Sequence, residues 1–476
     1  MKLKLLSLSF CMLFSALPVS ATPWLDTQDN YLRQSLQSLA QAGLLTGPVN
    51  TYPIMWKNIA IDLNRIDSAA LSPDLQFAVA HLRSALNANR AERQSGVKIK
   101  ANSATSSHQH FGETYFEDAA LSLFQEVQSD AVAGRLQVNR RALDGDNRSQ
   151  NSTEQSSTLD GSYLALINGN WVLQVDQAPV WWGPGQQSSL LLSNNARPMP
   201  SVRLTRHGWQ ADQRSWLRWL GPWSATTFLG YGQHNSAVPQ TRYWGGRLTL
   251  RPLPALELGA SRMIQWGGQG RSNGFSTLWD LISYDKRDEI PADQRAAIDA
   301  AWHLQLAGFP LTFYTELADD DNQSGTPDEL LQLWGVRSYF GETDGIRTLN
   351  LEYSDTFLTC ADELEPGDCA YQGGLYPDGY RRYGRIIGSG YGADAEVLSS
   401  AYHYQTLGGI SWSAQLTLAR YHQATVSDTS WQLKLEHRRG LFAGLLSLQL
   451  RYLQQSALRP ELDHQVSAAG SWEYRF

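Results

Sequence analysis

The chain ends in Trp472-Glu473-Tyr474-Arg475-Phe476, with an aromatic residue at every second position up to the last one. Successive side chains of a β-strand point to opposite faces, so this stretch predicts a strand with one apolar and one polar face. Such a strand suits a membrane barrel, whose outer face contacts lipid while its inner face lines a polar lumen. The last five residues therefore predict an all-β, antiparallel membrane barrel.

This ending is similar to the closing strand of bacterial outer-membrane barrels, which the barrel-assembly machinery recognises.

The start of the chain predicts export. Lys2 and Lys4 precede an apolar run, and Val19-Ser20-Ala21 is a small-residue cleavage site, so residues 1–21 are predicted to be a secretory signal peptide. No apolar run of the roughly 18 residues that a spanning helix needs follows it. The mature chain is therefore either a soluble exported protein or a barrel.

The composition agrees with a barrel. The 476 residues include 17 Trp, 20 Tyr and 39 Gly, 18% of them are charged, and the mean hydropathy is −0.37. Because half of each barrel strand faces a polar lumen, this hydropathy does not exclude a membrane protein. The net charge of −7 offers no basic patch for nucleic acid, which is therefore not a predicted partner.

Cysteine usage indicates one disulfide. Cys11 lies in the signal peptide, which leaves Cys360 and Cys369 as a close pair in an exported chain. Such a pair favours a disulfide that clamps a loop. The acidic residues between the two cysteines supply only part of a metal site, so a solvated loop is the preferred interpretation.

Residues 22–95 have a helical pattern and are predicted to form a small N-terminal helical domain. Asp29 to Ala42 places three leucines on one helical face, and Ser72-Pro73 opens a second helix. A domain of this size buries little core alone, so we expect it to pack on something larger.

Residues 96–476 are predicted to form the barrel, because the apolar period there is two. Apolar and polar residues alternate at Val132–Val138, Trp431–Leu435 and Leu446–Tyr452. Short links, such as Asn168-Gly169 and Arg439-Gly440, are separated by longer polar stretches, as short periplasmic turns are separated by long external loops. Counting through them predicts about 18 strands, with the helical domain and the C-terminus both on the periplasmic side.

No catalytic constellation is evident, so the protein is predicted not to be an enzyme. His108 and His110 are the only close histidine pair, and without a third ligand they are interpreted as surface histidines. The acidic run Asp319–Asp321 is interpreted as a solvated loop tip. No metal or cofactor is predicted.

Two neighbouring segments have the chemistry of a sugar-binding surface. Trp181-Trp182-Gly183-Pro184-Gly185 is followed by Ser193-Asn194-Asn195-Ala196-Arg197-Pro198. Indole rings can stack on sugars, while amides and a guanidinium can bind hydroxyls or a uronate carboxylate. The alternative is an aromatic girdle with loop packing, which the residue chemistry alone favours.

The block from Trp181 to Pro200 resembles the signature of the Wzi capsule-assembly family of Gram-negative outer-membrane barrels. The segment from Tyr376 to Gly388, which contains Tyr380-Arg381-Arg382, resembles the long-loop motif of the family, and Tyr52-Pro53-Ile54-Met55-Trp56 is similar to part of its periplasmic helical bundle. The matches reach from about residue 24 to the C-terminus. The polysaccharide-binding residues predicted from the two loop blocks are Trp181, Trp182, Asn194, Asn195, Arg197, Tyr380, Arg381, Arg382 and Arg385.

The resemblance implies a barrel of 18 strands in the cell outer membrane, with a periplasmic helical bundle and long loops at the cell surface. It implies a non-enzymatic surface lectin that attaches exported capsular or extracellular polysaccharide to the cell. Its expected partners are that polysaccharide, outer-membrane lipid and, during biogenesis, the barrel-assembly machinery.

An outer-membrane channel for sugars or other small solutes is the alternative function. A barrel of this size can enclose an aqueous pore. The charged residues expected to line the lumen are Arg135, Arg247, Lys434, Glu436 and Arg451. A lumen plugged by the loops that follow Ala178 and Leu358 is preferred, because both loops are long enough to fold inward. A lipid- or glycan-cleaving enzyme ranks lowest, because the chain offers no catalytic set.

Overall fold

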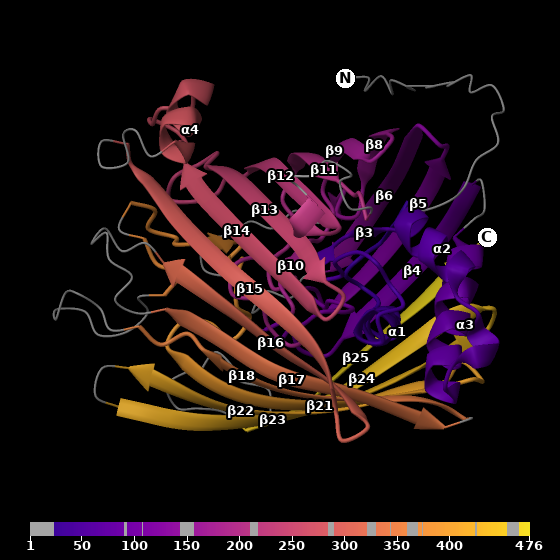
Figure 1. Cartoon of the computed structure of the whole chain (residues 1–476). Helices are drawn as coiled ribbons and strands as arrows, with labels where there is room; N and C mark the ends of the chain where they lie inside the picture. Colours follow the sequence, from indigo (N-terminus) through magenta and orange to yellow (C-terminus); the bar gives the residue numbers. More distant parts are fainter. Residues whose placement is uncertain are drawn as a thin grey trace, which may run out of the picture.

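The structure, a computed structural model, describes residues 23–89, 93–106, 108–142, 157–209, 218–283, 290–320, 330–342, 344–358, 370–373, 375–423, 426–454 and 466–476 (Figure 1). The predicted signal peptide lies outside these residues. So do Cys360 and Cys369, and their disulfide stays a prediction.

Eighteen antiparallel strands close a barrel, which confirms the predicted fold (Figure 1). The closing strand pairs with the first barrel strand through Trp472 and Ile99. The two-residue strand β7 (Ser157–Thr158) pairs with the same strand as β8 does. The barrel strands are β4 (Arg93–Asn102), β5 (Ala119–Gln128), β6 (Val132–Ala142), β8 (Tyr163–Asn168), β9 (Trp171–Asp176), β11 (Ser201–Arg206), β12 (Trp223–Tyr231), β13 (Arg242–Leu253), β14 (Leu256–Trp266), β15 (Ala292–Leu306), β16 (Phe309–Asp320), β17 (Leu331–Glu342), β18 (Gly345–Asp355), β21 (Ala395–Thr406), β22 (Ser411–Gln423), β23 (Val426–Leu441), β24 (Gly444–Gln454) and β25 (Val466–Arg475).

The strands alternate between an apolar outer face and a polar inner face, as the sequence predicts. On β24, Leu448 and Leu450 are 47% and 50% exposed, whereas Ser447 and Arg451, on either side of them, are buried. Apolar side chains that point away from the barrel form the surface that lipid contacts in membrane barrels. Polar side chains that are buried must therefore find partners inside the lumen.

Four α-helices accompany the barrel in the described residues: α1 (Asn30–Gln41), α2 (Trp56–Arg65), α3 (Pro73–Ala88) and α4 (Phe275–Ile282). None of them is long and apolar enough to cross a membrane. Asp29 caps α1 by accepting a hydrogen bond from the amide of Leu32 at 3.0 Å, and Pro73 occupies the first turn of α3. Helices α2 and α3 lie at the same end of the barrel as the C-terminus, and α4 lies at the opposite end (Figure 1).

Helix α1 and the chain that follows it are anchored to lumen-facing strand residues. Arg251 of β13 donates to the carbonyl oxygens of Ala40 and Leu45 at 2.6 and 2.7 Å, and Arg337 of β17 donates to that of Gln37 at 3.2 Å. Ala40 lies in the last turn of α1, where intrahelical donors run out, so Arg251 supplies a further donor to its carbonyl oxygen. The helical region thus shares its core with the barrel, including Tyr339, Ile346 and Trp181.

Candidate functional site

Loops fill much of the lumen. Residues 177–200, between β9 and β11, and the described part of residues 356–394, between β18 and β21, join one buried apolar cluster with the wall. The cluster brings Trp182 and Tyr380 of the loops against Phe228, Tyr243 and Tyr314 of the strands. We call residues 44–56, 177–200 and 370–394 the plug, with residue 374 outside the described chain. The predicted plugged lumen thus agrees with the structure.

Two of the motifs that suggested the family meet inside the plug. Strand β10 (Trp181–Trp182) pairs with β2 (Thr51–Tyr52), which places Trp181 opposite Tyr52. The amide of Gly183 donates to the carbonyl oxygen of Asn50 at 3.0 Å. The Trp181 ring packs edge-on against Phe111 with centroids 5.4 Å apart. The N-terminal motif and the tryptophan motif therefore form one structural unit.

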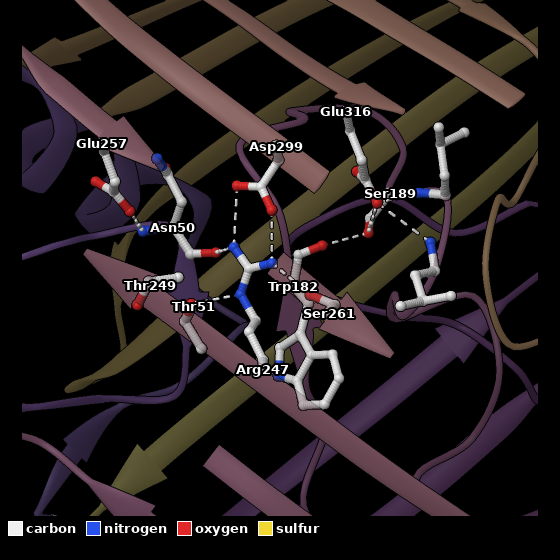
Figure 2. Close-up of polar contacts among 12 residues, drawn as sticks. Asn50, Thr51, Trp182, Ser189, Arg247, Thr249, Glu257, Ser261, Asp299 and Glu316 are labelled. Atoms are coloured by element: carbon white, nitrogen blue, oxygen red, sulfur yellow. Dashed lines mark hydrogen bonds and ion pairs between the residues drawn. The ribbon is translucent and has the colours of Figure 1, made fainter. Parts of the chain in front are cut away.

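Wall carboxylates hold the plug by its backbone. Glu257 of β14 accepts from the amides of Val49 and Asn50 at 2.9 Å each, and Glu316 of β16 accepts from that of Leu190 at 3.1 Å (Figure 2). Glu352 of β18 accepts from three consecutive plug amides, those of Gln186, Gln187 and Ser188. Hydrogen bonds to an ionised acceptor are stronger than neutral ones, so each carboxylate fixes a loop that has no sheet of its own.

A buried ion pair completes this wall. Arg247 of β13 makes a bidentate contact with Asp299 of β15, at 2.6 and 3.1 Å, and donates to Thr51 Oγ1 at 2.7 Å (Figure 2). The pair joins two strands to the plug strand β2. Its desolvation penalty is offset because both charged groups are paired and hydrogen-bonded.

The structure buries the two tryptophans of the predicted site. Trp181 and Trp182 are 0% and 1% exposed, so both pack inside the plug and neither offers a ring face to solvent. This placement agrees with the loop-packing interpretation. A part for the tryptophans in polysaccharide binding stays a prediction.

The two predicted loop blocks come together through backbone contacts. Asn195 donates to the carbonyl oxygen of Ile386 at 2.9 Å, and Arg385 Nε donates to that of Asn195 at 2.6 Å. Tyr380 is buried and donates to the carbonyl oxygen of Leu191 at 3.0 Å. Asn194 donates to the carbonyl oxygen of Thr27, and Arg382 donates to that of Tyr231. Arg197 forms an ion pair with Glu117, and Arg381 is half-buried. All of these contacts are within the plug, to the wall or to adjoining loops.

Two interpretations from the sequence are wrong. His108 and His110 are buried rather than on the surface, because the loop between β4 and β5 lies against the plug, where His110 Nδ1 is 2.9 Å from the carbonyl oxygen of Gln187. Asp320 is likewise buried instead of solvated, because it pairs with Arg295 at 2.8 Å. Neither contact is local in sequence, so no short pattern indicates it. In the described residues, no group of three potential ligands suits a metal ion.

A cavity of about 500 Å³ remains between the plug and the wall formed by β4–β6 and β23–β25. The loop between β4 and β5 closes part of it, with His108, Glu113 and Tyr115. Two residues of the predicted site, Asn194 and Arg197, reach this cavity. Small-molecule sites in proteins have volumes of roughly 300–1,000 Å³, so the cavity has room for a sugar unit.

Comparisons with known proteins agree with this architecture. The family model described as capsule assembly protein Wzi matches residues 78–407. A Klebsiella pneumoniae protein, described as an uncharacterized 55.8 kDa protein in the cps region, is 31% identical over 318 residues, which span 66% of this chain and 61% of that protein.

One solved structure matches almost the whole chain. It is that of Wzi from Escherichia coli, described as an outer-membrane protein involved in group 1 capsule assembly and as a carbohydrate-binding β-barrel. It superposes with a TM-score of 0.82 and 27% identity, over 95% of this chain and 99% of that one. From the family model, which covers most of the sequence, and from this fold, we conclude that the chain belongs to the Wzi capsule-assembly family.

Proposed function

We propose that the protein is an outer-membrane lectin that attaches exported capsular or extracellular polysaccharide to the cell surface without catalysing a reaction. The observation that carries this proposal is the match of barrel, plug and helices to a carbohydrate-binding barrel over nearly the full length of both chains. Its outer apolar belt supports a place in the outer membrane with lipid as a partner. The aromatic C-terminal strand supports insertion by the barrel-assembly machinery.

In this proposal the end that carries α2, α3 and the C-terminus faces the periplasm, and the end that carries α4 and the long loops faces outward. The even number of strands supports it, since the chain enters and leaves the barrel at the same end (Figure 1). A cysteine placed in the loop at Gln233, between β12 and β13, should react with an impermeant thiol reagent on intact cells. A cysteine in the turn at Gly308 should react only after lysis.

Deletion of the gene tests the function. If the protein attaches polymer, the deletion strain releases polysaccharide into the medium while the total amount is unchanged, and the wild-type gene restores attachment. A fall in total polymer would indicate a role in synthesis or export. An unchanged distribution between cells and medium would contradict any role in attachment.

The loop residues of the predicted site are tested on the same strain. Because Arg381 is half-buried at the edge of the plug, its change to alanine should release polymer and leave folded barrel in the membrane. Thr241, a neighbouring buried loop residue that donates to the carbonyl oxygen of Val238 at 2.7 Å, provides a packing control as Thr241→Val. Equal release by both variants would assign Arg381 a structural role.

A further inference from the structure

Most cations that line the cavity are paired with carboxylates. Lys98 and Lys100 both contact Glu113, at 2.7 and 2.8 Å. Arg438 pairs with Asp29 at 2.8 Å, and Arg197 pairs with Glu117 at 3.0 Å. These pairs neutralise the charge that the strands and the plug bring into the lumen, as buried charges require.

Lys434 and Arg451 differ from these cations. They lie directly opposite each other on β23 and β24, and both line the cavity. Arg451 donates to Ser467 Oγ at 2.8 Å and, weakly, to the carbonyl oxygen of Ala104 at 3.5 Å. Among the described residues, no carboxylate lies within ion-pair distance of either cation, and Lys434 has no hydrogen-bond partner. Glu436, two residues along the same face of β23, also lines the cavity and attracts Lys434 electrostatically.

Glu436 balances at most one of the two cations, so the opposed pair keeps a net positive charge. Like charges directly opposite each other on neighbouring strands repel, and a cation away from bulk water needs a counter-charge. The loop that faces the pair is in the same positive field. Burial, together with the nearby charges of Arg451, Arg385 and Lys434, lowers the pKa of His108 to about 3, so this histidine is neutral and adds no charge. The cavity therefore presents a local excess of positive charge to whatever enters it.

The rest of the lining suits a sugar. Amide and hydroxyl side chains donate and accept hydrogen bonds as sugar hydroxyls do, and a guanidinium beside an ammonium suits a carboxylate. The uncharged polar residues that line the cavity near the pair are Gln432, Ser447, Gln449, Ser467, Asn194 and Gln109.

We propose that Lys434 and Arg451 bind the carboxylate of an acidic sugar, a uronate unit of the polysaccharide, in this cavity. The identity of the ligand as part of a polysaccharide rests on the proposed function. The site itself rests on the opposed cations and the cavity.

Binding to the purified full-length protein in detergent tests the proposal. The probe is a glucuronate-containing disaccharide, and its matched control is the same disaccharide with the carboxyl group reduced to the neutral alcohol. Wild-type protein should bind the acidic form at least about tenfold more tightly, the range expected of one charge-assisted contact. Lys434→Gln and Arg451→Gln should each remove that preference. Arg439→Gln, near the end of the same strand and with an exposed side chain on its opposite face, should retain it.

Equal binding of the acidic and reduced disaccharides by wild-type protein would overturn the inference. So would a preference that survives both cavity substitutions. Sodium acetate and inorganic phosphate serve as competitors. If acetate or phosphate displaces the disaccharide at a concentration similar to that at which the disaccharide binds, the site is a general anion site and the sugar assignment is wrong. A variant that shifts normally on heating in gel electrophoresis retains the folded barrel, so misfolding is scored separately.

Failure here is distinguishable from failure of the proposed function. If deletion releases polymer but Lys434→Gln binds the uronate normally, the attachment role remains and the site is wrong. If the cation pair binds uronate but deletion releases no polymer, the site remains and the attachment role is wrong.

Discussion

Removal of one wall carboxylate should loosen the plug. Glu352 Oε2 accepts from the amide of Gln186 at 2.6 Å and from Tyr314 Oη at 3.0 Å, and Oε1 accepts from the amides of Gln187 and Ser188 at 3.1 Å each. Glu352→Ala leaves three buried amides without an acceptor. Because one unsatisfied buried donor costs roughly 1–3 kcal/mol, the loss is about 3–9 kcal/mol, toward the lower end where water enters.

Glu352→Gln should have a smaller effect. Its carbonyl oxygen can still accept from Gln187 and Ser188, while its amino group can donate to the Tyr314 oxygen, which leaves one amide unpaired at about 1–3 kcal/mol. Ser354→Ala is the matched control, since Ser354 is buried on the same face of β18 and its hydroxyl has no partner among the described residues.

Two measurements follow the plug. The temperature at which the folded barrel shifts in gel electrophoresis should fall in the order Ser354→Ala, Glu352→Gln, Glu352→Ala. In a planar bilayer, Glu352→Ala should show open-channel events that wild-type protein lacks, because residues 184–188 are released from the wall. If Glu352→Ala behaves like Ser354→Ala in both measurements, the wall carboxylate does not hold the plug.

Three further predictions use other contacts. Arg247→Met leaves Asp299 buried without its cation, so it should lower the free energy of unfolding by about 3–5 kcal/mol, and the double variant with Asp299→Leu should recover most of it; urea unfolding measures both. Trp182→Ala should lower stability by about 3–5 kcal/mol and reduce the folded fraction on heating; full stability with loss of bound polymer would instead indicate direct binding. Burial lowers the pKa of His81 in α3 from 6.5 to about 4, so its contribution to the stability of the helical region should be complete above pH 6.5 and decrease as the pH falls toward 4; urea midpoints should fall less steeply over this range for His81→Gln than for wild type, and equal slopes would contradict the role of His81.

Local periodicity is sufficient to predict the barrel, because the alternation of apolar and polar residues within each strand identifies its outward and inward faces. The plug depends on contacts of another kind. Arg33 of α1 donates to the carbonyl oxygen of Gly185 at 2.8 Å, although 152 residues separate the two in the sequence. No window of sequence contains both partners, so the histidines that this packing buries were assigned to the surface. The structure shows Trp181 and Trp182 packed inside the plug, and their part in polysaccharide binding stays a prediction.

The cation pair shows why the candidate site was only partly predictable. Alternation correctly predicted that Lys434 and Arg451 face the lumen. Their opposition depends on register, which the hairpin turn sets, and the sequence suggested a turn at Arg439-Gly440. The turn lies instead at Phe442-Ala443, where φ values of 51° and 60° match a tight two-residue hairpin turn. The predicted turn would have placed Lys434 opposite Leu445. Since the two registers differ by an even number of residues, every side chain keeps its face while every cross-strand partner changes, and the opposed cations emerge only from the folded hairpin.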